Sequence, residues 1–185
     1  MSELHQIRFP SESDEYREAR NKLLHAEMDL RRKKEEVAKQ LRNLPLGGKV
    51  KEDYVFEQLG NSDETKKVKL SELFANSKNC LAIYSFMYST QMEKACPSCT
   101  SILDSLNGNS PHITQRMNFV VVAKSPIKRV QEWAKFRRWN NLNLLSSENN
   151  SYNSDYFAET KDGDQMPMLN LFLKNESGIF HTYAT

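Results

Sequence analysis

The sequence has little of what would mark several large classes of protein. It has only three cysteines in 185 residues, too few for a disulfide framework. No apolar stretch approaches the roughly 18 to 20 residues that cross a bilayer, and residues 1–5 have neither the basic nor the apolar region of a secretory signal. We therefore expect a soluble, cytoplasmic protein that makes no contact with a membrane.

An excess of charge of one sign is also missing. The 26 Lys and Arg residues nearly balance the 24 Asp and Glu residues, which leaves a net charge of +2. A general nucleic-acid binder shows a clear basic excess, so no nucleic-acid partner is expected. The 38% of hydrophobic residues can build one core of ordinary size, and the 27% of charged residues leave a large polar remainder. The composition predicts one domain with a polar extension.

The polar extension is predicted to be a long helix. Residues 12–44 contain no Gly or Pro and are dense in good helix formers, with Ser11 or Ser13 available as the N-cap. Steps of four and three residues trace a narrow apolar seam with two polar interruptions. Its members are Ala19, Leu23, Ala26, Leu30, Lys33, Val37, Gln40 and Leu44. We expect the seam to be buried against protein, either the chain's own domain or a second subunit in a homo-oligomer.

Residues 45–185 are predicted to form an α/β domain, and residues 1–44 the helical extension. Apolar runs predict buried strands at 81–87 and 119–123, and between them a helix runs from Pro97 to about Asn107, closed by Gly108. A connection of that length makes the two strands parallel. Around this unit the sequence predicts a hairpin near 54–70, a helix after Ser125-Pro126, and a final hairpin of strands 168–173 and 179–183.

Two cysteines stand where that central helix begins, in the segment Cys96-Pro97-Ser98-Cys99. The free N–H groups and the positive end of the helix dipole favour a thiolate there. Residues three apart on a first turn can also close a disulfide, so Cys99 can resolve a mixed disulfide formed at Cys96. We predict that Cys96 attacks and that Cys99 resolves.

A second candidate element is Met166-Pro167, directly before the strand 168–173. Proline cannot donate a ladder hydrogen bond, so its place at the start of a strand indicates a special loop with a cis bond. A CxxC motif alone is a moderate signal of thiol redox chemistry. Within a strand–helix–strand unit that is followed by a hairpin with a proline at its start, it becomes a strong one.

This order of elements resembles the thioredoxin superfamily, with the longer strand-to-cysteine loop of its peroxiredoxin branch. More closely, five segments resemble the thioredoxin-like family labelled domain of unknown function 899. They are Lys51–Phe56, Lys69–Phe74, Ala95–Cys99, Phe119–Ala123 and Phe180–Tyr183. The resemblance implies a central mixed sheet of peroxiredoxin-type strand order flanked by helices. It also implies that Met166 and Pro167 lie opposite the cysteines and bind substrate.

Some positions depart from the patterns of better understood relatives. Peroxiredoxins have Thr or Ser three residues before the reactive cysteine, where this chain has Glu93, and thioredoxins have Trp where it has Ala95. The first departure argues against peroxidase activity, and the second against a general reductant role of the thioredoxin type. Thiol–disulfide exchange through the CxxC pair is expected ahead of peroxidase activity. The partner would be a protein or small-molecule disulfide, and the sequence does not identify the electron donor.

The remaining candidate residues are interpreted as structural. Cys80 begins a buried strand and is expected to be an inert core thiol. His112 or His181 could join the two cysteines around zinc, but a closed zinc site needs a second close pair of ligands. We expect no metal and no cofactor. The alternative to an oxidoreductase is a non-catalytic thioredoxin-like binding module that uses the N-terminal helix for assembly.

Overall fold

The computed structural model describes residues 8–60, 63–75 and 77–185. The chain divides into two compact units at the junction of Pro45 and Leu46. The first contains α1 (Asp14–Arg42), and the second contains the sheet and the remaining helices. Within the described residues, no helix has both the length and the apolar character needed to cross a membrane.

The long N-terminal helix is confirmed. Its N-cap is Ser13, whose hydroxyl accepts a hydrogen bond from the Tyr16 amide at 3.1 Å. The large side chains of the predicted seam lie in the open: Leu23, Leu30 and Val37 are 53%, 57% and 54% exposed. The described residues of this unit, 8–45, therefore do not cover the seam.

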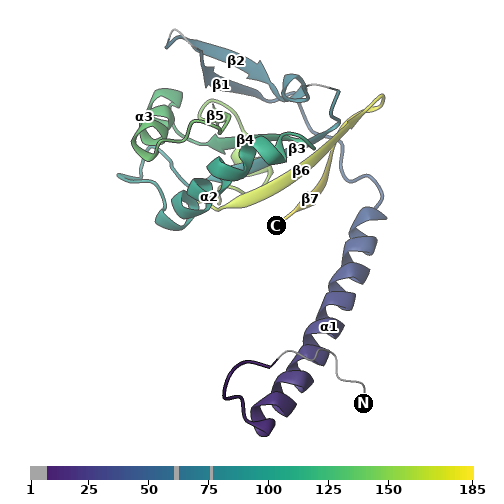
Figure 1. Cartoon of the computed structure of the whole chain (residues 1–185). Helices are drawn as coiled ribbons and strands as arrows, with labels where there is room; N and C mark the ends of the chain where they lie inside the picture. The colour runs from purple at the N-terminus through teal and green to yellow at the C-terminus, as the bar shows by residue number, and fades with distance from the viewer. Residues whose placement is uncertain (1–7, 61–62, 76) are drawn as a thin grey trace. The chain divides into compact units, whose positions relative to one another are not determined.

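The second unit is built on one seven-stranded mixed sheet (Figure 1) in the order β2-β1-β5-β4-β3-β6-β7. Its strands are β1 (Val55–Leu59), β2 (Thr65–Lys69), β3 (Cys80–Phe86), β4 (Asn118–Ala123), β5 (Leu144–Ser146), β6 (Met168–Asn175) and β7 (Gly178–Ala184). The three central strands β3, β4 and β5 are parallel, and the outer pairs are antiparallel. The predicted fold class is confirmed, and so are both hairpins and the strand–helix–strand unit.

Helices cover both faces of this sheet. Helices α2 (Pro97–Ile113) and α3 (Ile127–Arg137) pack on one face, over side chains such as Tyr84 and Phe86. The short helices η1 (Leu70–Leu73) and α4 (Tyr152–Asp155) contribute to a second core on the other face. Successive residues of β3 alternate between the two cores, which explains why the strand is apolar on both faces, with the buried Ser85 as its one polar residue.

Helix α2 runs further than the predicted end at Gly108. It continues through Pro111 to Ile113, which packs against the core. Proline has no N–H for the carbonyl of Asn107, four residues earlier, and the Asn141 side-chain amide donates to that carbonyl instead at 3.1 Å. A contact from a distant loop therefore satisfies the carbonyl that Pro111 leaves without its helical donor.

Adjacent residues of α2 offer a direct test of this packing. Leu103 is fully buried, whereas its neighbour Ile102 is 46% exposed. We expect Leu103→Ala to lower the free energy of unfolding by about 2–5 kcal/mol, because it leaves a cavity in the core. Ile102→Ala removes a similar side chain from the surface and should cost less than about 1 kcal/mol. Urea denaturation of both variants measures the difference, and equal losses would contradict the orientation of α2.

Candidate functional site

The Cys96-Pro97-Ser98-Cys99 segment forms the first turn of α2, as predicted. Cys96 is the N-cap and is partly exposed. Its amide donates to the carbonyl of Met87 at 3.1 Å, and its carbonyl accepts the helical bond from the Thr100 amide at 2.9 Å. The first turn contains no acidic residue. The positive end of the helix is therefore free to stabilise negative charge on a sulfur at the N-cap.

Cys99 lies one turn further in and is only 1% exposed. Both cysteines are free thiols. Burial is the main cause that raises the pKa of the Cys99 thiol, and the neighbouring Cys96 thiol raises it further. The Tyr84 hydroxyl and the Met87 backbone oppose this rise without cancelling it. The two thiols thus differ in access, since the first faces solvent and the second lies in the core.

Tyr84 of β3 is a site residue that the sequence analysis did not single out. Its hydroxyl is buried and forms no hydrogen bond of normal geometry with the described residues. The polar group beside it is the Cys99 thiol, and the pKa of Tyr84 is raised by burial first and by this neighbour second. The only sequence signal that could have pointed to Tyr84 is its place on the same face of β3 as Phe86, the face that packs toward α2.

Arg129 of α3 was also missed, and it holds the loop that leads to the cysteines. Its guanidinium lies 4.1 Å from the centre of the Tyr88 ring. It donates to the carbonyl of Ser89 at 2.6 Å and to the carbonyl of Met92. A longer bond of 3.4 Å reaches the carbonyl of Glu93, so one cation binds three backbone carbonyls of the segment between β3 and α2.

Met166 and Pro167 lie at the start of β6, but the bond between them is trans. The predicted cis bond is therefore wrong. Trans is the lower-energy form of an X-Pro bond, and the Met166 amide is tied to the Ala158 carbonyl at 2.9 Å, so nothing in this loop requires the cis form. Met168 pairs with Ser85, which brings the start of β6 to the same end of β3 as the cysteine turn.

Cys80 and His181 both lie away from the cysteine turn. Cys80 is half-buried at the far end of β3 from the cysteine turn. His181 of β7 hydrogen-bonds the Asn170 side chain at 2.9 Å and meets the Phe172 ring edge-on in the second core, on the opposite face of the sheet from Cys99. The described residues hold no group of three or more His, Cys, Asp or Glu side chains that could bind a metal ion.

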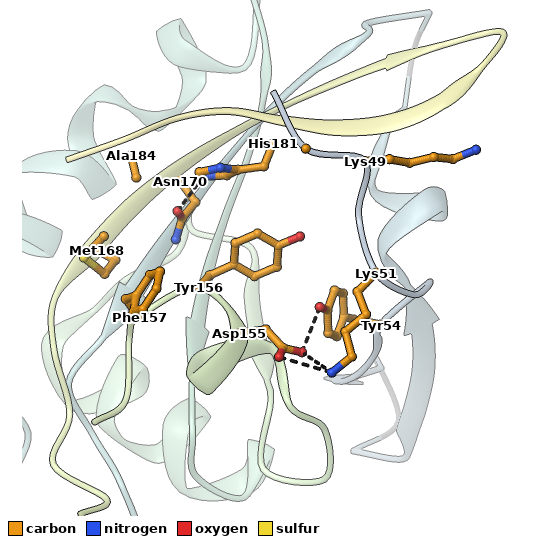
Figure 2. Close-up of a pocket in the computed structure, with 11 residues that line it drawn as sticks. Lys49, Lys51, Tyr54, Asp155, Tyr156, Phe157, Met168, Asn170, His181 and Ala184 are labelled. Carbon is orange, nitrogen blue, oxygen red and sulfur yellow. Dashed lines mark hydrogen bonds and ion pairs between the residues drawn. The ribbon is translucent and has the colours of Figure 1, made fainter. Parts of the chain in front are cut away.

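That opposite face also carries a pocket of about 310 Å³ (Figure 2). Tyr54 and Lys51 both bind the carboxylate of Asp155 at its rim, at 2.9 Å and 3.2 Å. His181 and Asn170 lie at the inner wall. Burial lowers the pKa of His181, so its ring is neutral at pH 7. The pocket contains no nucleophilic thiol and is separated from the cysteines by the sheet.

The fold and the position of the cysteines define a thioredoxin-like protein. The family model described as "Bacterial protein of unknown function (DUF899)" matches residues 5–185, so the chain belongs to this family. The comparison with curated proteins gave no match.

Solved structures of peroxiredoxins share the fold. The mitochondrial 2-Cys peroxiredoxin from Plasmodium falciparum is 13% identical with a TM-score of 0.57, over 76% of this chain and 82% of that one. AhpC from Enterococcus faecalis is 11% identical with a TM-score of 0.55, over 76% and 79%. Reduced Prx3 from Vibrio vulnificus, solved in complex with H2O2, is 10% identical with a TM-score of 0.55, over 77% and 87%.

The bonds of Arg129 predict a local effect on the cysteine loop. We expect Arg129→Gln to increase amide hydrogen exchange across residues 89–94, because three carbonyls lose a charged donor, and a bond of normal length to such a donor is worth about 1.5–3 kcal/mol. The adjacent exposed residue provides the control, and Lys128→Gln should leave the exchange unchanged. Protection that is equal in both variants would show that the arginine does not hold the loop.

The contact between Tyr84 and Cys99 predicts a pH effect. Because the hydroxyl lowers the pKa of Cys99, Tyr84→Phe should raise that pKa further and reduce the thiolate fraction at neutral pH, with the difference lost at high pH. The free energy of unfolding should change by less than about 0.5 kcal/mol, since the hydroxyl has no normal hydrogen bond to lose.

Thiolate absorbance, followed against pH in a Cys80→Ser, Cys96→Ser background, isolates Cys99 for this measurement. Tyr88→Phe is the matched control, because it removes a hydroxyl near the same loop but not beside Cys99. A Cys99 titration that is identical in all three proteins would contradict the contact.

Proposed function

We propose that this protein is a thiol–disulfide oxidoreductase in which Cys96 attacks and Cys99 resolves. The observation that carries the proposal is the pairing of a partly exposed thiol at the N-cap of α2 with a buried thiol one turn inside it. The shared fold of solved peroxiredoxins is compatible with redox chemistry, but it supports only the scaffold.

The reaction begins at Cys96. Its thiolate attacks one sulfur of a partner disulfide, the partner's S–S bond breaks, and the released sulfur leaves as a thiolate that takes up a proton. The product of this step is a mixed disulfide between Cys96 and the partner. Attack at this position is favoured because the helix end stabilises the attacking anion and because solvent reaches Cys96.

Cys99 completes the exchange. Its thiolate attacks the sulfur of Cys96, the second partner thiolate leaves, and an intramolecular disulfide remains. Two electrons pass from the Cys96–Cys99 dithiol to the partner disulfide. A second dithiol must then reduce the protein by the same steps in reverse. Because Cys99 has a raised pKa, the resolving step should accelerate with pH through the neutral and mildly alkaline range.

The substrate would dock across the turn formed by Cys96 and the start of β6. Met166 is 45% exposed and Pro167 is exposed, and both lie at the end of β3 from which the cysteine turn begins. We assign them to the binding of a protein or small-molecule disulfide. We also assign the reaction to the cytoplasm, where reducing conditions maintain the two free thiols.

The cysteine roles predict distinct labelling and trapping. At limiting iodoacetamide and neutral pH, mass spectrometry should find Cys96 alkylated before Cys99 and Cys80, because it is more accessible than Cys99 and, unlike Cys80, stands at the N-terminus of a helix. Cys99→Ser should accumulate mixed disulfides with a disulfide substrate such as oxidised glutathione, and Cys96→Ser should not. Cys80→Ser serves as the control and should behave like the parent protein.

A titration of free thiols before and after mild oxidation separates this function from the non-catalytic alternative. The proposal requires a reversible loss of two thiols, and of none in Cys96→Ser. Equal labelling of all three cysteines without trapping would leave a thioredoxin-like binding module.

A further inference from the structure

Helix α1 carries large apolar side chains at intervals of seven residues. They are Tyr16, Leu23, Leu30 and Val37, and each is more than half exposed. An ideal α-helix has 3.6 residues per turn, so a repeat held at seven residues follows a left-handed supercoil rather than a straight line. The positions three residues later, which complete the seam, are Ala19, Ala26, Lys33 and Gln40.

The open seam is a distinct face of the helix. On another face Arg17 is buried and paired with Glu12, and Leu24 and Met28 are half-buried. Among the described residues nothing covers the seam in this way, although it holds four large apolar side chains. Leaving each of them in water forgoes roughly 1.5–3 kcal/mol of burial energy, which favours association with a matching surface.

The charges that flank the seam match a second copy of the same helix. In a parallel pair, the residue just before each large seam residue faces the residue five positions later on the other helix. This rule gives Glu15 opposite Arg20, Lys22 opposite Glu27, and Asp29 opposite Lys34. All three pairs join opposite charges, and each occurs twice in a symmetric dimer.

An antiparallel pair of the same helices lacks this match. When two copies of α1 overlap fully in opposite directions, Glu27 meets Glu27, Asp29 meets Asp29, and Arg20 meets Lys34. These three contacts join like charges, which destabilises the pair, and only the contact of Lys22 with Glu36 joins opposite charges. Because all three pairs of the parallel arrangement are attractive, the charge pattern favours the parallel orientation.

Lys33 is the one charged residue within the seam, and it already has a partner. Its ammonium lies 2.7 Å from the Glu36 carboxylate. In the parallel arrangement Glu36 faces the uncharged Leu41 of the other copy, so it remains available to neutralise Lys33. Lys33 therefore weakens the seam without preventing the pairing.

We propose that two copies of this chain associate through α1 as a parallel, two-stranded coiled coil. In this dimer each large seam side chain packs against the same residue of the other copy. The three charge pairs lie along both edges of the seam. Several of these charges form intrahelical pairs in the single chain, such as Arg20 with Glu27 and Lys22 with Glu18. Exposed pairs of this kind are worth less than about 1 kcal/mol, so exchanging them for pairs between helices costs little.

Analytical ultracentrifugation of the full chain tests the association. The parent protein should sediment as a dimer with twice the 21.5 kDa mass of the chain. Leu30→Asp should weaken the dimer about a hundredfold or more, because it places two unpaired carboxylates within the seam. His25→Asp adds the same charge on an exposed face outside the seam and should leave the dimer intact. A parent protein that is monomeric at 100 µM, or equal effects of the two variants, would overturn the proposal.

A charge exchange tests the orientation. Lys22→Glu and Glu27→Lys should each weaken the homodimer about tenfold, because each creates two like-charged pairs. In a mixture of the two variants, the parallel heterodimer restores opposite charges at both sites, and its affinity should return to within about threefold of the parent. Circular dichroism confirms that both variants keep the helix. A mixture no tighter than either variant alone, or a trimer, would exclude the parallel pair.

Discussion

The pairing of β3 with β4 on one edge and with β6 on the other is the interaction on which the site depends. The carboxyl end of β3 leads through residues 87–95 to the cysteine turn, and the Cys96 amide returns to Met87 to close that loop. The neighbour β4 leads into α3 and so supplies Arg129, and the neighbour β6 begins at Met168, directly after Pro167. Three segments distant in sequence therefore meet at one end of one strand.

The sequence revealed those parts of the fold whose signals are local. The apolar runs of β3 and β4 and the Gly- and Pro-free composition of α1 were sufficient to predict all three. The end of α2 was not predictable in this way, because Asn141, which satisfies the carbonyl freed by Pro111, lies thirty residues further along the chain. The three-residue strand β5 and the four-residue helix α4 are too short for a periodic pattern.

In the candidate site too, only the residues with a local sequence signal were predicted. The two cysteines could be found from their spacing and from the strand and helix around them. Arg129 could not, because its partners are backbone carbonyls, which leave no mark on the sequence. Tyr84 was not identified because its position in the alternating pattern of β3 is equally typical of a residue that only packs in the core. The cis bond was predicted from the place of Pro167 at the start of a strand, and this prediction is wrong because the loop forms its hydrogen bond with a trans bond.

The burial of Cys99 beneath Cys96 also bears on how the protein would survive oxidative damage. An oxidant that reaches the pair meets Cys96 first, and its first product there is a sulfenic acid. A sulfenic acid condenses with an adjacent thiol and releases water, and Cys99 is that thiol. The condensation competes with irreversible oxidation to the sulfinic acid, so the inner cysteine would act as a safeguard that keeps the outer one recoverable.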